Sequence, residues 1–139
     1  MNVRAVIFGF VILLAATSNF GFFYGQIDNP EYHDVVELFT ALAATLVATV
    51  LKFGDRTQVG AVHLATSFVA DLQLLAAVAI WAYATLVSVD GLTSGITTVM
   101  VSMSGGALTA NMVSVLLLVL KTVSFRAPWA GSRATRHAD

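Results

Sequence analysis

The sequence predicts an all-α integral membrane protein, an up-down bundle of four transmembrane helices with both termini in the cytoplasm. The first observation is composition: 58% of the 139 residues are apolar and 11% are charged, against roughly 45–50% and 25% in soluble domains. The second is that four apolar stretches reach the length of about 20 residues that crosses a hydrocarbon core. The third is that all 7 Lys and Arg residues fall on one side of these four spans.

The same composition argues against several classes of function. So few charges cannot cover a soluble fold, which disfavours intrinsic disorder, nucleic-acid binding and a cytosolic enzyme. The chain has no cysteine, so disulfides, thiol nucleophiles and thiolate metal sites are excluded. It also lacks the glycine-rich phosphate loop and the common serine-hydrolase and zinc-protease motifs. We therefore expect no enzymatic activity, no cofactor and no metal site.

We expect a single transmembrane domain over residues 1–125, followed by a basic cytoplasmic tail over residues 126–139. The four helices are predicted at residues 5–25, 30–53, 57–88 and 95–123. The first apolar run continues well beyond the small residues Ala15 and Ala16 to Tyr24. This favours a membrane helix over a cleaved signal peptide.

The connections between the helices are short and carry helix-end signals. Asn29 suits a helix cap and Pro30 suits a first helical position, so we expect the second helix to begin there, ahead of its apolar span from about Val35. Gly54 can end that helix in a left-handed conformation, and Asp55 or Thr57 can cap the third helix. Short connections force neighbouring helices to run antiparallel, which predicts the up-down order.

The distribution of charges predicts the orientation in the membrane. Basic residues translocate poorly and remain in the cytoplasm. They precede the first span, lie between the second and third, and follow the fourth: Arg4, Lys52, Arg56, Lys121, Arg126, Arg133 and Arg136. The two remaining loops carry acids and no basic residue. Both termini are therefore expected in the cytoplasm.

Asp71 is the costliest residue of the third span. At 1.5 Å per residue it lies roughly 18 Å into the helix, where an aspartate costs about 2.5–3.5 kcal/mol. It must therefore be protonated, paired or facing water. His63, Ser67 and Asp71 are spaced four residues apart and share one helical face. This face can carry protons or a cation, or Asp71 can donate a hydrogen bond that holds helices together.

Other amides lie at a comparable depth. Asn19 of the first span and Asn111 of the fourth are candidate partners of Asp71, and together the three make a candidate ion or proton pathway with His63 and Ser67. Gln73 lies near the opposite face of the third span, so we expect protein on both sides of that helix. One side then belongs to the bundle interior and the other to a subunit contact.

A strip of small residues recurs every four positions in the fourth span. It consists of Ser102, Gly106, Ala110 and Ser114. Such strips let helix backbones approach closely and drive association in membranes. The strip predicts helix packing, and with Gln73 it favours a homo-oligomer. Gly105 and Gly106 also allow a second interpretation, in which the helix is broken and exposes carbonyls to ions.

An acidic cluster surrounds the start of the second span on the side without basic residues. It consists of Asp28, Glu31, Asp34 and Glu37. In a ring of subunits these carboxylates would form a vestibule that favours cations. The alternative is that acids at a helix N-terminus interact favourably with the helix dipole.

Four segments carry a resemblance to a known family: Ile27–Pro30, Val50–Thr57, Val69–Leu74 and Gly105–Leu108. They resemble a family of small, uncharacterised four-helix proteins of the bacterial inner membrane. The resemblance extends from the first helix through the fourth. It implies a bacterial inner membrane, and it implies no activity and no site residues.

Two functions from different classes remain open. One is an oligomeric cation or proton channel or transporter subunit, in which Asp71 lines a water-accessible path. The other is a non-transporting accessory or scaffold subunit that stabilises a larger membrane complex. In both cases the expected partners are the lipid bilayer, further copies of the chain or a larger membrane complex, and not nucleic acid.

Overall fold

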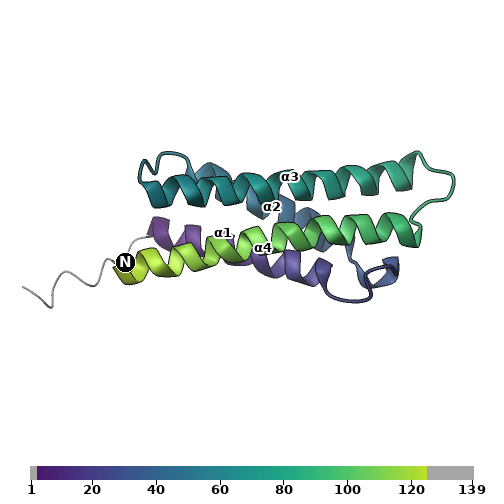
Figure 1. Cartoon of the computed structure of the whole chain (residues 1–139), viewed down its shortest axis with the longest axis horizontal. Helices are drawn as coiled ribbons and strands as arrows, with labels where there is room; N and C mark the ends of the chain where they lie inside the picture. Colours follow the sequence, from purple (N-terminus) through teal and green to yellow (C-terminus); the bar gives the residue numbers. More distant parts are fainter. Residues whose placement is uncertain (1–2, 125–139) are drawn as a thin grey trace, which may run out of the picture.

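The computed structural model describes residues 3–124 and consists of helices joined by short loops. The helices are α1 (Val3–Phe23), the short 3-10 helix η1 (Pro30–Tyr32), α2 (Val35–Lys52), α3 (Gln58–Leu86) and α4 (Ser94–Ser124). Residues 3–124 contain no strand. Consecutive long helices run antiparallel, so α1 begins and α4 ends at the same end of the bundle (Figure 1). Helices that follow one another in the sequence pack together, and α1 also packs on α4, so each long helix contacts two others. This confirms an all-α fold of four long helices.

The distribution of side chains in the bundle differs from that of a soluble bundle, because many large apolar side chains lie on its outer surface. Its interior is made largely of small side chains, and buried alanines let the helix backbones approach closely. Large apolar side chains point outward instead, among them Phe10, Val50, Leu72, Leu86 and Leu116, each more than half exposed. All four long helices are long and apolar enough to cross a membrane. Together these features indicate a multi-pass membrane protein.

The second long helix begins at Val35, five residues later than the expected start at residue 30. Asn29 does act as a cap, but its side chain accepts from the Glu31 amide at 3.0 Å and begins only the short helix η1. The backbone of His33 is then extended. Asp34 supplies a second cap by accepting from the amide of Val36 at 2.8 Å. The two caps, Asn29 and Asp34, therefore divide the helix expected from residue 30 into the short helix η1 and the long helix α2.

The connection between α2 and α3 follows the expected pattern. Gly54 has a φ of +103° just after α2 ends. Thr57 caps α3 by accepting from the Gly60 amide at 3.0 Å. Asp55 in turn accepts from the Thr57 amide at 3.1 Å. The ends of α1, α3 and α4 lie within two residues of the expected ones, whereas the expected tail over residues 126–139 lies outside the described residues.

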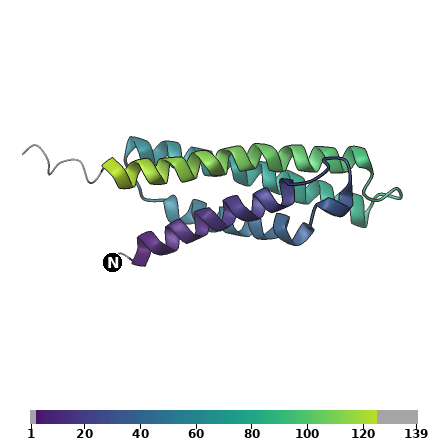
Figure 2. The same cartoon turned by 90° about the horizontal axis from the view of Figure 1, so that it is seen from below.

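The two ends of the bundle differ in charge. We call one the basic end, because it carries Arg4, Lys52, Arg56 and Lys121, the four basic residues of the described chain. We call the other the acidic end, because the α1–α2 and α3–α4 loops there contain Asp and Glu residues but no Lys or Arg. Figure 2 shows α1 and α4 spreading apart towards the basic end.

Candidate functional site

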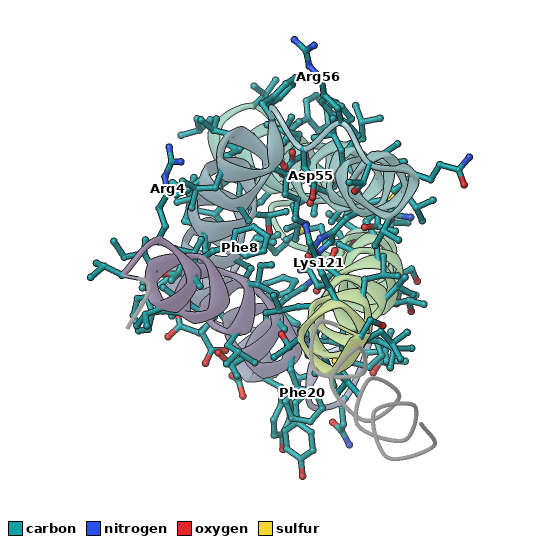
Figure 3. All side chains as sticks on the ribbon, turned by 90° about the vertical axis from the view of Figure 1, so that its left-hand side faces the viewer. Arg4, Phe8, Phe20, Asp55, Arg56 and Lys121 are labelled. Atoms are coloured by element: carbon teal, nitrogen blue, oxygen red, sulfur yellow. The ribbon has the colours of Figure 1, made fainter. Side chains whose placement is uncertain are left out.

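A cavity of about 850 Å³ lies among the helix ends at the basic end. Its lining comes from all four long helices and the α2–α3 loop, and includes Phe8, Lys52, Asp55, His63 and Lys121. In Figure 3, which views this end, Asp55 and Lys121 lie near the centre of the bundle, whereas the side chains of Arg4 and Arg56 extend away from it. The helix ends thus enclose a space bordered by both polar and aromatic groups.

An ion pair bridges this cavity. Lys121 of α4 donates to the carboxylate of Asp55 in the α2–α3 loop, and both side chains are partly exposed. Hydrogen bonds from Lys121 and from Thr57 hold the pKa of Asp55 well below its usual value. The Asp55 carboxylate therefore stays ionised at ordinary pH, and the charge of Lys121 is compensated within the chain.

Lys52 lies deeper and has a different environment. It is the last residue of α2 and is 5% exposed. Its ammonium donates to the hydroxyl of Ser67 on α3 and to that of Ser114 on α4, the latter at 3.1 Å. No carboxylate of the described chain lies within 4.0 Å of its Nζ. A buried ammonium group at the inner wall of the cavity is therefore hydrogen-bonded, among the described residues, only to two neutral hydroxyl groups.

Asp71 lies about one helical turn further into the bundle. It is 5% exposed, and its Oδ2 accepts from Thr49 Oγ1 of α2 at 2.6 Å. Its Oδ1 has no hydrogen-bond partner among residues 3–124. Thr49 and Lys52 are three residues apart on α2, and Ser67 and Asp71 four apart on α3, so each pair lies on one face of its helix. The two cross-helix bonds form a ladder leading inward from the cavity.

His63 completes the inner face of α3. It lines the cavity, is 4% exposed and lies edge-on to the ring of Phe8 at a centroid distance of 5.6 Å. Its Nε2 has no hydrogen-bond partner within the described chain. The structure therefore places His63, Ser67 and Asp71 on one buried face of α3, with His63 nearest the cavity.

The two asparagines do not join Asp71 in one hydrogen-bonded cluster. Asn19 is fully buried, and its Oδ1 accepts from Ser104 Oγ of α4 at 2.5 Å. Asn111 is also buried, and the Nδ2 of each asparagine lacks a partner in the described part of the chain. The expected direct contact of Asp71 with Asn19 and Asn111 is replaced by its bond to α2, because Thr49 faces Asp71 across the α2–α3 interface.

The small-residue strip of α4 turns mainly inward. Gly106 lies against the side-chain amide of Gln73 on α3, and Ala110 and Ser114 are buried, whereas Ser102 is exposed. Gln73, expected at a subunit contact, therefore meets α4 of its own chain. The helix runs unbroken through Gly105 and Gly106, so the broken-helix interpretation is not observed.

The acidic cluster lies at the opposite end of the bundle from the cavity. Asp28, Glu31 and Asp34 are exposed, and Asp34 is the cap of α2. Glu37 is half-buried, with its carboxylate against Gly21 of α1. These acids are therefore separate from the buried polar ladder.

Sequence reasoning treated Lys52 only as a marker of orientation and missed its place in the site. A signal was present in the spacing of α2. Its inward positions include Leu38, Thr45, Thr49 and Lys52, which recur at three, four or seven residues and share one face of a helix. Because this face carries small and hydroxyl residues, a lysine at its end can point inward.

The fold and the buried ladder define the class, a helical multi-pass membrane bundle with a polar interior. Residues 32–122 of the chain match the family of unknown function DUF6394, and the protein belongs to that family. The match covers α2, α3 and all but the last two residues of α4, and thus every member of the Lys52–Asp71 ladder. No curated protein and no solved structure matches the chain.

Proposed function

We propose that this protein is an inner-membrane subunit that conducts protons, with Asp71 at mid-membrane as the group that takes up and releases them. One observation supports this most: the polar ladder from the cavity at Lys52 and His63 to Asp71. Ionisable residues inside a membrane are costly and mark ion or proton paths. The unpartnered Oδ1 of Asp71 is a position where a proton can reside.

The position of Lys52 favours protons over larger cations. Its ammonium lies at the inner wall of the cavity, where it repels a metal cation, whereas it can exchange a proton with a group to which it is hydrogen-bonded. Within each of the two cross-helix bonds of the ladder, Lys52 to Ser67 and Thr49 to Asp71, the polar groups are in direct hydrogen-bond contact. A proton can pass between such groups, whereas a hydrated metal ion needs an open pore.

We further propose a bacterial inner membrane and a cytoplasmic position for both termini. Support comes from the charge distribution, since the four basic residues of the described chain gather at one end and basic residues stay in the cytoplasm. The cavity then opens to the cytoplasm. Asn19 and Asn111 are candidates for the outer half of the path, and the acidic cluster for its external mouth. A homo-oligomer, formed through the outer faces of the helices, remains part of this proposal.

Proton flux in reconstituted liposomes tests the proposal. Asp71→Asn keeps the volume of the side chain and can keep its bond to Thr49, but it cannot ionise, so it should abolish flux and leave expression nearly unchanged. Asp90→Asn is the matched control, because Asp90 is an exposed acid in the α3–α4 loop, and it should conduct like the wild type. Wild-type liposomes that hold a proton gradient as well as empty ones would end the proposal.

A second function has its own support. The bond between Thr49 and Asp71 joins α2 to α3, and Lys52 joins α2 to both α3 and α4. Such bonds hold membrane helices together and suit an accessory or scaffold subunit of a larger membrane complex. This function predicts that Asp71→Asn is tolerated, that Asp71→Ala destabilises by about 0.6–2 kcal/mol, and that a larger partner co-purifies in fixed ratio, with no flux in any variant.

A further inference from the structure

We infer that the cavity at the basic end binds an amphiphilic anion, a phosphate or carboxylate group attached to an apolar body, with Lys52 as its counter-charge. This site goes beyond the proposed function, because binding requires only the cavity and its lining and no movement of protons. The ligand chemistry follows from three features of the cavity within the described residues: a buried cation without an ion-pair contact, an imidazole nitrogen without a partner and a partly apolar wall.

The buried cation without an ion-pair contact in the described chain is Lys52. A buried ammonium costs several kcal/mol unless it is paired, yet its bonds run only to the neutral hydroxyls of Ser67 and Ser114. An ammonium has three N–H donors, so one remains for a ligand. Because Lys52 lines the cavity, an anion there can accept that donor and neutralise the charge.

The unsatisfied imidazole is His63. It lines the same cavity and its side chain is buried, with 4% exposed. Its Nε2 has no hydrogen-bond partner within residues 3–124. Buried polar atoms without a partner are rare and often mark a missing ligand or water. An Nε2–H tautomer can donate to an anion held by Lys52. The sequence thus brings two donors, from α2 and α3, to one wall.

The remaining charges do not oppose this assignment. Asp55 is the one carboxylate that lines the cavity, and Lys121 is its partner. Arg4 also lines the cavity, but its side chain extends away from the bundle (Figure 3). Asp71 acts on Lys52 through space but forms no ion pair with it within 4.0 Å. Lys52 is therefore the buried cation of the cavity that has no carboxylate of residues 3–124 in contact.

The size and wall of the cavity indicate a ligand larger than an inorganic ion. Its volume of about 850 Å³ lies in the range of small-molecule sites. Phe8 of α1, Val50 of α2 and Leu118 of α4 add apolar surface to its lining. The anionic group can come from the headgroup of a lipid or from a soluble amphiphile.

Binding of octyl phosphate to the full chain, purified in a zwitterionic detergent, tests the site by calorimetry. The wild type should bind it saturably, and octyl glucoside, which has no charge, should not compete. Lys52→Met should weaken binding about tenfold or more, as expected for a lost hydrogen bond to a charged group. Arg56→Gln is the matched control, because this exposed basic residue lies outside the cavity lining, and its binding should equal that of the wild type.

Two further measurements keep the test decisive. If Lys52→Met fails to fold, His63→Gln should still weaken binding, and the absence of saturable binding to the wild type overturns the inference. Equal binding by Lys52→Met and the wild type overturns it as well. Nanodiscs distinguish the two sources: retention of phosphatidylglycerol over phosphatidylcholine, with loss of octyl phosphate binding, assigns the site to a lipid. Octyl phosphate binding that persists in phosphatidylglycerol nanodiscs assigns it to a soluble anion.

Discussion

The two buried histidines of the described chain lie at opposite ends of the bundle and have opposite environments. At the acidic end, His33 Nδ1 lies 2.6 Å from the carbonyl oxygen of Phe22 and its Nε2 lies 2.8 Å from that of Gln26. At the basic end, His63 Nε2 has no partner in the described residues. The His33 imidazole therefore holds backbone groups together, whereas the Nε2 of His63 is available to bind a ligand or a proton.

The role of His33 follows from where α1 ends. The last carbonyls of a helix have no partner within the helix, and basic side chains there interact favourably with them. His33 supplies this interaction to Phe22 and also packs against the Phe22 ring at a centroid distance of 5.5 Å. Both neighbours are acceptors, and each lies beside a different nitrogen of the ring. At the acidic end a histidine thus contacts the last turn of α1, whereas at the basic end Nε2 of the buried histidine has no such contact within residues 3–124.

The largest expected effect comes from the same substitution at each histidine. His33→Leu should lower the free energy of unfolding by about 2–4 kcal/mol, because it removes a buried imidazole that lies between two carbonyl oxygens and packs on the Phe22 ring. His63→Leu should change it by less than about 1 kcal/mol in either direction, because it removes a polar atom that had none. Thermal unfolding of both variants in one detergent measures the difference. Equal losses at the two positions would mean that the two ends do not differ as described.

Two glycines in helical first turns extend the comparison to packing. A Cβ on Gly60 of α3 would meet the carboxyl group and the backbone oxygen of Asp55, whereas a Cβ on Gly95 of α4 meets nothing within 4 Å. Gly60→Ala should therefore destabilise by about 1–3 kcal/mol. Gly95→Ala should stabilise by up to about 1 kcal/mol, since alanine favours helix. Thermal unfolding checks both signs, and a stabilising Gly60→Ala would contradict the close contact at the basic end.

The smallest expected effect concerns pH at the basic end. Because the folded pKa of Asp55 lies below its ordinary value, the ion pair with Lys121 adds stability at neutral pH, and this contribution is lost as pH falls below the ordinary range of a carboxylate. Asp55→Asn should lower Tm modestly at neutral pH and remove that part of the acid dependence. Asp90→Asn, which changes an exposed acid at the other end, should follow the wild-type curve. Identical pH profiles for all three proteins would contradict the pairing.

Much of the fold and part of the site follow from the sequence. Apolar runs of sufficient length predict the four helices, and the four-residue spacing of His63, Ser67 and Asp71 predicts their shared face. The start of the second helix does not follow, because Asn29 and Asp34 are both good caps and only the structure shows which one begins α2. Lys52 was missed because a lysine at the end of a membrane helix usually extends to the interface.

The sequence by itself determined the helical class, the number of long helices, the membrane character and the division of charge between the two ends. These properties depend on composition and on spacing along one chain. Only the tertiary structure decided that Lys52 turns inward, that Thr49 rather than Asn19 bonds to Asp71, and that Gly106 meets Gln73 of its own chain. The physical reason is that a buried polar group bonds to whichever acceptor or donor the packed helices bring within about 3 Å, and that distance is set between helices, not along them.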